Sequence, residues 1–451
     1  MLEGGGADAA VGSARGAGGL RADQLPRLRV ADLLRTYGRA YLAERGAGAC
    51  LAERRTLAEL TACRTPALGS HTWRCDSCGH EHEAYNSCRN RHCPTCGGPA
   101  RAAWLDRMLV DVLPVPYFHL VFTLPATLST LVLANRSALY GLLFRAAWQA
   151  MQALAADPEH LGASVGAVLV LHTWGQNLHH HPHVHGVVPG GGLSADGTRW
   201  VPSHSPKYLL CAKALSRKFR GKFLAGLKRL WRTGKLKLGG ALAGLADELA
   251  FERWLTPLYE QDWVVHIQPP PKSCQGPEAV LKYLARYVAG AAISDHRLVS
   301  HENGEVRFWG KNYRQGRKRQ ILPLSGVEFV RRWMVHVLPP GFVRVRYYGL
   351  LANTQRRAQV ARCRQLLSSR GGGEEPGLPS RPVPPAALPA DTAAPACPAC
   401  GRGRLWLLRG RGHARPSRSE VLSASPFAAP WLRPATLASS VITVPAGQDS
   451  S

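Results

Sequence analysis

The chain has 451 residues, with 57 lysines and arginines against 30 acidic residues and a formal net charge of +27 at pH 7. This excess of positive charge predicts a polyanionic partner, of which nucleic acid is the leading candidate. No apolar run reaches the roughly 18 residues that a membrane-spanning helix needs, and the first residues lack the apolar core of a secretory signal. These features argue against a membrane protein and predict a cytoplasmic one.

Composition divides the chain into five regions, and its length is enough for two or three domains. Residues 1–27 are rich in Gly and Ala, and we expect them to be disordered. Residues 28–110 hold an apolar pattern of helical period up to about Gly46, followed by the first cysteines. Residues 111–365 form the predicted main domain, and residues 366–395 a Pro- and Gly-rich linker. Residues 396–451 combine a half zinc knuckle with a tail that we expect to be disordered.

Two Cys-x-x-Cys motifs, Cys75–Cys78 and Cys93–Cys96, are separated by fourteen residues, and each is followed by Gly. Because paired thiolates at this spacing can turn toward one ion, the four cysteines predict a tetrahedral structural zinc site. Other candidate ligands leave open a Cys3His set or a second ion, and they are Cys63, His71, His80, His82, Cys88 and His92.

A third motif, Cys397-Pro-Ala-Cys400-Gly401, has no second pair near it in the sequence. It is a weak half-site that could use His413 or an amino-terminal cysteine. The zinc module could serve only as a structural staple. Alternatively it also contacts phosphates, which the neighbouring Arg89 and Arg91 favour.

Residues 167–192 hold six of the eighteen histidines, between two apolar runs that predict a strand, a loop and a second strand. His183 and His185 are two residues apart, so they point to the same side of the second strand. By the same alternation, His172 and Gln176 share one face of the first strand. Two neutral imidazoles can ligate a divalent metal and leave positions open for substrate, which indicates catalysis. Solvated loop histidines are the alternative.

The main domain is predicted to be α+β, with an antiparallel sheet and helices. A strand over residues 117–124 is followed by a helix that Asn135 can cap, and then by the two histidine-bearing strands. Strand, helix, strand, strand is how a ferredoxin-like sandwich begins. Further along, residues 263–268 read as a strand, and a hairpin is predicted to turn at Glu302 to Gly304. Ser325 and Glu328 form a capping box that opens another helix.

The run VLKYLARYVAG over residues 280–290 has helical character, with Gly290 suited to its end. Tyr283 and Tyr287 are four residues apart, so their hydroxyl groups lie on one face of the predicted helix. Lys282 and Arg286 lie beside them. Two tyrosines at this spacing are ordinarily packed in a core, and a pair of nucleophiles is the alternative.

Basic residues mix with aromatic ones along much of the chain, as they do on surfaces that bind single-stranded nucleic acid. Residues 207–237 form a basic amphipathic segment that could contact a DNA backbone or could simply be a solvated helix face. The candidate DNA-binding residues are Arg89, Arg91, Arg217, Arg220, Lys282, Arg286, Arg331, Arg332, Arg344 and Arg346.

Several stretches resemble the two-tyrosine HUH rolling-circle transposases of the IS91 group, over about residues 28–362. The stretches that carry this resemblance are YNSCRNRHCP, FHLVFTLP, HTWGQNLHHHPHVHG, LSRKFRGKF, YLARYV and FVRRWMVHVLPPGFVRVRYYG. Where many relatives continue after the tyrosines with a Thr-His-Arg-like run, this chain has Val288-Ala289-Gly290.

The resemblance implies a zinc-ribbon-like module that binds the transposon end, followed over residues 111–365 by an HUH endonuclease fold. His183 and His185 would bind Mg²⁺ or Mn²⁺, with Gln176, His172 or a residue of the tyrosine helix as a third ligand. Tyr283 would attack first and Tyr287 second. Such enzymes nick single-stranded DNA and transfer it without a double-strand break. The implied protein is nucleoid-associated and could form homo-oligomers.

Two other hypotheses compete with this one. A metal-dependent oxygenase could use His183, His185 and a carboxylate as a facial triad, but it gives no reason for the positive charge or the tyrosine pair. A zinc-containing DNA-binding protein without catalysis, such as a degenerate transposase or a repressor, predicts binding that survives loss of the histidines and tyrosines.

Overall fold

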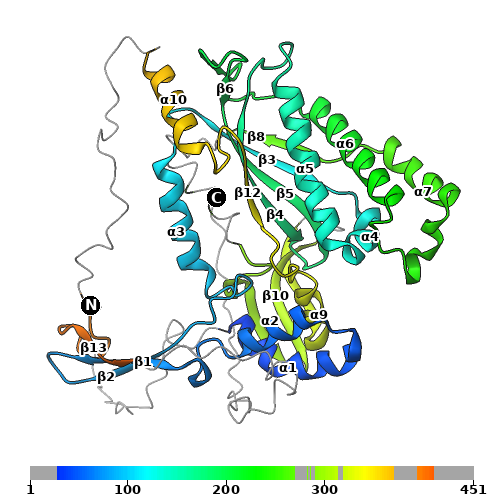
Figure 1. Ribbon diagram of the computed structural model, residues 1–451. Coiled ribbons are helices and arrows are strands. Elements are labelled where there is room, and N and C mark those ends of the chain that lie inside the picture. The colour runs from blue at the N-terminus through cyan, green and yellow to red at the C-terminus, as the bar shows by residue number, and fades with distance from the viewer. Residues whose placement is uncertain are drawn as a thin grey trace, which may run out of the picture.

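The computed structural model describes residues 28–269, 282, 285, 290–312, 318–369 and 394–410 (Figure 1). Its centre is a five-stranded antiparallel sheet in the order β12–β4–β5–β3–β8. The strands are β3 (Tyr117–Thr123), β4 (Gly166–Trp174), β5 (His180–Pro189), β8 (Val265–Gln268) and β12 (Val345–Gly349). The prediction of a mixed α+β fold with antiparallel sheets is confirmed.

One face of this sheet is covered by helices and forms the largest core. Phe118, Leu120 and Phe122 alternate along β3, and their side chains pack with those of the helices in one buried cluster. Figure 1 shows this helical layer on one side of the sheet. The helices of the layer are α4 (Ser129–Ala134), α5 (Arg136–Ala155), α6 (Ala212–Arg232) and α7 (Glu248–Glu260).

One detail of this layer bears on a sequence prediction. Helix α5 begins directly after Asn135, but the Asn135 side chain does not cap it. Its amide instead exchanges hydrogen bonds with the backbone of Lys237, at 2.7 and 3.1 Å.

Among the described helices, none combines the length and the apolar character that a membrane-spanning helix needs.

The opposite face of the sheet packs against a different set of elements. Val168, Val170 and Val187 lie on it and belong to a cluster that includes residues of α3 (Gly97–Val110) and α10 (Arg356–Ser368). The short strands β6 (Gly191–Leu193) and β7 (Trp200–Pro202) pair with each other and add Leu193 and Trp200 to the same cluster. This is the face that carries the strand histidines.

The amino-terminal helices pack against a second, three-stranded sheet. Helices α1 (Val30–Arg45) and α2 (Leu51–Thr61) share a core with α9 (Gly326–Met334) and with strands β9 (Leu298–Glu302), β10 (Glu305–Asn312) and β11 (Lys318–Ser325). A Cβ atom at Gly326 would lie 2.3 Å from the Tyr37 ring, so glycine lets α9 approach α1 closely. This hydrophobic core therefore joins residues of two regions that the sequence analysis separated, 28–110 and 111–365.

One local prediction in this sheet is confirmed and another in part. Strands β9 and β10 form the expected hairpin, and Asn303 and Gly304 turn it with φ angles of 50° and 79°. The side chain of Ser325 accepts a hydrogen bond from the backbone N–H of Glu328 at 3.3 Å, as an N-cap of α9 does. The capping box is not completed, because the Glu328 carboxylate accepts from Arg331 and Arg332 instead.

A third sheet combines two segments that are far apart in the sequence. Strands β1 (Ser70–Cys75) and β2 (Glu81–Tyr85) form a hairpin, and β13 (Leu405–Gly410) pairs with β1 in antiparallel fashion. The sequence analysis did not predict this pairing, because β13 follows a long Gly- and Pro-rich segment.

Candidate metal centre

The pairing of β4 with β5 brings three histidines onto one face of the five-stranded sheet. His172 lies directly opposite His183, and His185 follows two residues later on the same face. One side-chain nitrogen of each lies within 4.8 Å of the corresponding nitrogens of the other two. The predicted pair of His183 and His185 is therefore joined by His172, one of the candidates for a third ligand.

Gln176, another candidate, does not continue this face. Strand β4 ends at Trp174, and a bulge between His172 and Trp174 interrupts the alternation of side chains. Gln176 is exposed in the following turn, where its backbone oxygen accepts a hydrogen bond from Arg297. The expectation that Gln176 shares a strand face with His172 is therefore wrong.

Hydrogen bonds define which ring nitrogens of the histidine pair carry protons. Nδ1 of His183 donates to the backbone oxygen of His181 at 2.7 Å. Nδ1 of His185 lies 2.8 Å from Nε2 of His119, whose Nδ1 lies 3.3 Å from Oε1 of Gln268. Because an amide oxygen only accepts, we assign His119 Nδ1 as a donor, and His185 Nδ1 then donates to His119. Nε2 of both His183 and His185 is left with a lone pair.

These two Nε2 atoms are only 3.1 Å apart. Their lone pairs repel each other unless a proton or a cation bridges them. Burial lowers the pKa of His183 to about 4, and burial together with His172 and His183 lowers the pKa of His185 well below its ordinary value. Neither ring therefore takes up a second proton at neutral pH, so both imidazoles are uncharged. Neutral imidazole is the form that ligates divalent metals. This donor set fits a metal ion.

His119 is a residue of this site that the sequence analysis missed. It lies on β3, is buried, and stacks on the His185 ring with a centroid separation of 5.0 Å. The signal that could have found it is a single histidine in the middle of an apolar strand, where a polar side chain needs a partner.

Replacing His119 with leucine should weaken Mn²⁺ binding about 10- to 100-fold, because His185 loses the partner that orients its ring. Titration of the full chain with Mn²⁺, followed by electron paramagnetic resonance, measures this affinity without interference from thiolate-bound zinc. His266→Leu is the matched control, since His266 is an exposed histidine on the neighbouring strand β8. Equal affinities of the His119 variant and the unmodified chain would show that His119 does not position His185.

The cysteines do not form the expected site. Eight of them form two groups of four, and the pairs Cys75–Cys78 and Cys93–Cys96 lie in different groups. The prediction that the two pairs share one ion was wrong, because the first pair lies at the turn of the β1–β2 hairpin, whereas the second precedes α3. The alternatives of a second ion, and of amino-terminal cysteines as partners of the third motif, agree with the two groups. The groups are Cys63, Cys88, Cys93, Cys96 and Cys75, Cys78, Cys397, Cys400.

In the first group, Cys63 Sγ lies 3.8 Å from Cys93 Sγ and 3.6 Å from Cys96 Sγ. Four thiolates that are each about 2.3 Å from one tetrahedral zinc ion would be about 3.8 Å apart, whereas a disulfide needs about 2.05 Å. Cys88 was among the candidates and belongs to the group. His92 does not, since its Nε2 accepts a hydrogen bond from the backbone of Leu338 at 3.4 Å.

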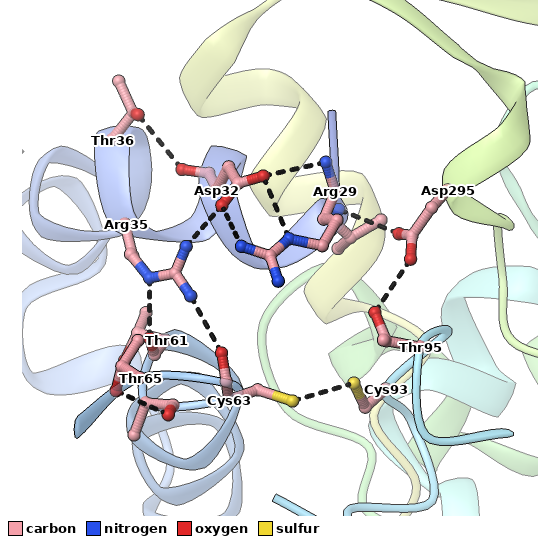
Figure 2. Close-up of polar contacts among 12 residues, drawn as sticks. Arg29, Asp32, Arg35, Thr36, Thr61, Cys63, Thr65, Cys93, Thr95 and Asp295 are labelled. Atoms are coloured by element: carbon pink, nitrogen blue, oxygen red, sulfur yellow. Dashed lines mark hydrogen bonds and ion pairs between the residues drawn. The ribbon is translucent and has the colours of Figure 1, made fainter. Parts of the chain in front are cut away.

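Polar contacts lock this first group into the protein body (Figure 2). Arg35 of α1 donates to the backbone oxygen of Cys63 at 3.0 Å. Asp295 accepts from the backbone N–H of Val30 at 3.0 Å and from the hydroxyl of Thr95 at 2.8 Å. Because Thr95 lies between Cys93 and Cys96, these hydrogen bonds connect the start of α1 to the segment that carries these two cysteines.

Two of the predicted DNA-binding arginines line a small pocket close to the histidines. Arg91 and Arg344 border it together with Trp174, and Trp174 stacks on His172 with a centroid separation of 4.6 Å. Within the described residues, both guanidinium groups donate to backbone carbonyls and neither pairs with a carboxylate. Burial lowers the pKa of Arg344 to about 10, so it stays charged at neutral pH. The lining of the pocket is therefore positively charged.

The other predicted DNA contacts are dispersed. Arg331 and Arg332 both pair with Glu328, which neutralises part of their charge. Helix α6, which carries Arg217 and Arg220, packs on the face of the sheet opposite the histidines. The remaining described residues of the set are Arg89 and Lys282, which are exposed, and Arg346, which lies over the Phe144 ring. Tyr283, Arg286 and Tyr287 lie outside the described residues.

Comparisons with known proteins give the class. Residues 166–359 match a family described as "Putative transposase", and residues 33–124 match one described as "Transposase zinc-binding domain". The protein is a transposase with an amino-terminal zinc-binding domain. More particularly, the chain belongs to the IS91 family of transposases.

Two relatives cover most of the chain. "Putative transposase y4qJ" of Sinorhizobium fredii is 48% identical over 338 residues, which are 75% of this chain and 84% of the relative. "Transposase for insertion sequence element IS801" of Pseudomonas savastanoi pv. phaseolicola is 31% identical over 369 residues, which are 80% of this chain and 85% of the relative. No solved structure matches the chain.

Proposed function

We propose that this transposase nicks and joins single-stranded DNA at the ends of its element, through intermediates in which a tyrosine is bonded to a 5′ phosphate. The observation that carries the proposal is the group of His172, His183 and His185 on one face of an antiparallel sheet. On the same basis we assign the five-stranded sheet to the HUH endonuclease fold.

The three histidines would hold a divalent ion, which would polarise the scissile phosphate. Mg²⁺ takes oxygen ligands by preference, so an all-imidazole set favours Mn²⁺ or needs further oxygen ligands. His119 would keep Nε2 of His185 directed at the ion by accepting a hydrogen bond from Nδ1–H.

Tyr283 supplies the first nucleophile and Tyr287 the second. The phenol oxygen loses its proton and bonds to phosphorus, the bond from phosphorus to the 3′ oxygen breaks, and that oxygen leaves as a hydroxyl after taking up a proton. The new phosphotyrosine bond is broken in turn when a 3′ hydroxyl attacks the same phosphorus and releases the tyrosine. One DNA strand is thereby transferred without a double-strand break.

A described residue between the tyrosines supports this assignment. Ala285 is buried and belongs to the same hydrophobic cluster as Val168 and Val170. Val170 lies directly opposite His185 in the pairing of β4 with β5. Ala285, which lies between the two tyrosines in the sequence, is therefore part of the cluster on the histidine face of the sheet.

The small pocket between Arg91 and Arg344 would attract a backbone phosphate of the bound strand through its positive charge. Its two cations lack carboxylate partners among the described residues, and Trp174 connects it to the histidine group. Phosphate contacts of this kind position a strand without reading its sequence.

The test uses a single-stranded oligonucleotide that spans the element's end and is labelled at its 3′ end. After nicking, the labelled segment should stay bonded to the protein and migrate with it in a denaturing gel, with Mn²⁺ but not in metal-free buffer. Metal should be removed by gel filtration, because a chelator would also strip zinc. Salt-dependent binding without an adduct in any divalent metal would instead identify an inactive DNA-binding protein.

A further inference from the structure

The second group of cysteines combines residues from distant parts of the chain. Cys75 and Cys78 lie at the turn between β1 and β2, and Cys397 and Cys400 precede β13. The matched zinc-binding domain covers residues 33–124 and so contains only the first two of them. The site is therefore incomplete without the carboxyl-terminal segment, residues 394–410.

The sulfur positions fit a tetrahedral ion. Cys75 Sγ lies 3.8 Å from Cys400 Sγ, and Cys78 Sγ lies 3.8 Å from Cys397 Sγ. This is the separation of about 3.8 Å that thiolates about 2.3 Å from one zinc would have. Soft thiolate ligands in this number select zinc over Mg²⁺ or Mn²⁺.

The two half-sites have matching backbone conformations. Gly79 and Gly401, each directly after the second cysteine of its pair, have φ angles of 70° and 66°. The backbone N–H of each donates to the carbonyl of the first cysteine, at 3.1 and 2.9 Å. Both segments are therefore shaped as knuckles that direct two thiolates to one point.

Backbone groups also point at the sulfurs, as they do where thiolates are charged. The N–H of Ser77 lies 3.4 Å from Cys75 Sγ, and the N–H of Gly403 lies 3.3 Å from Cys400 Sγ. A Cβ atom at Gly403 would lie 2.3 Å from Cys75 Sγ, so glycine is needed where the segment crosses the cluster.

Apart from the pairing of β13 with β1, few contacts among the described residues hold the carboxyl-terminal segment in place. Within the part of the chain that the structure describes, the hydrophobic cluster around it has three buried members, Cys75, Cys397 and Leu405, and two of them are candidate ligands. Asp76 accepts hydrogen bonds from the backbone of Arg404 at 2.8 Å and from the Trp406 indole at 3.2 Å. A core this small does not stabilise a fold alone, and metal binding commonly supplies the missing free energy.

We propose that Cys75, Cys78, Cys397 and Cys400 bind a second structural zinc ion, which fastens residues 394–410 to the β1–β2 hairpin. The Cys63 group binds the other. The second ion joins the β1–β2 hairpin and the carboxyl-terminal segment into one module, and β13 extends the hairpin as a third strand only while that ion is bound.

Zinc content tests this directly on the purified full chain, measured by elemental mass spectrometry after gel filtration in metal-free buffer. Cys397→Ser/Cys400→Ser should contain one zinc ion per chain fewer than the unmodified protein. Cys75→Ser/Cys78→Ser should lose the same amount, and the variant with all four changes should lose no more. Cys50→Ser/Cys211→Ser is the matched control, because neither cysteine belongs to a group.

Limited trypsin digestion gives a second readout that does not depend on activity. Cleavage after Arg402, Arg404 and Arg409 should be at least about 10-fold faster in Cys397→Ser/Cys400→Ser, because the opened segment has lost its strand pairing. Cleavage elsewhere in the chain should keep its rate. A carboxyl-terminal double variant that keeps all of its zinc, or that loses two ions per chain, would overturn the proposal.

Discussion

Replacing His183 and His185 together with alanine should lower metal-dependent nicking by about 10³-fold or more, since the ion and its several kcal/mol of charge stabilisation are lost. Binding of the same oligonucleotide should remain, because the cationic surface is unchanged. Adduct formation in denaturing gels measures the first quantity, and fluorescence anisotropy over a series of salt concentrations measures the second.

His179→Ala is the matched control, since His179 is an exposed histidine of the same stretch and is outside the three-histidine group. It should nick at the rate of the unmodified protein. His172→Ala should fall between the control and the double variant, because two imidazoles remain to hold the ion. Undiminished nicking by the double variant would show that the histidine group takes no part in the nicking reaction.

The second large effect concerns the tyrosines. Tyr283→Phe should abolish the covalent adduct, to below about one part in 10³, because phenylalanine keeps the ring and lacks the attacking oxygen. Tyr287→Phe should still form the adduct but fail to join the strand to a target. Tyr208→Phe, at an exposed tyrosine far along the chain from this segment, is the matched control.

The chain itself allows the attacking residue to be identified by peptide mass. Trypsin cuts after Lys282, Arg286 and Arg297, so Tyr283 and Tyr287 fall in separate peptides of the adduct. A nucleotide-modified peptide 283–286 is the expected result. Modification of peptide 287–297 would reverse the proposed order, and modification of neither would exclude both tyrosines as nucleophiles.

The sequence predicted well those features that depend on neighbouring residues. The hairpin at Asn303-Gly304 follows from residues that tolerate positive φ, and the start of α9 follows from the Ser325 cap. The shared direction of His183 and His185 follows from the period of a strand alone. Asn135 is the exception, because its side chain found partners on a segment about a hundred positions away.

Long-range pairing decided the rest of the metal site. His172 joins the pair because β4 and β5 align in a particular register, and the bulge in β4 excludes Gln176 from that face. His119 reaches His185 because β3 happens to be the next strand of the sheet. Register and strand order depend on the packing of the whole domain, and no local pattern contains them.

The sequence by itself determined which residues could act as ligands: a His-x-His pair on a strand and three Cys-x-x-Cys knuckles, each defined within a few residues. Only the tertiary structure decided which of them meet. The sulfur of Cys75 lies beside that of Cys400, 325 positions away in the sequence. The sulfur of Cys93, which is much nearer to Cys75 in the sequence, lies beside that of Cys63 instead. The physical reason is that a knuckle defines the direction of only two thiolates, whereas the other two ligands of a four-ligand site must be brought to it by the rest of the folded chain.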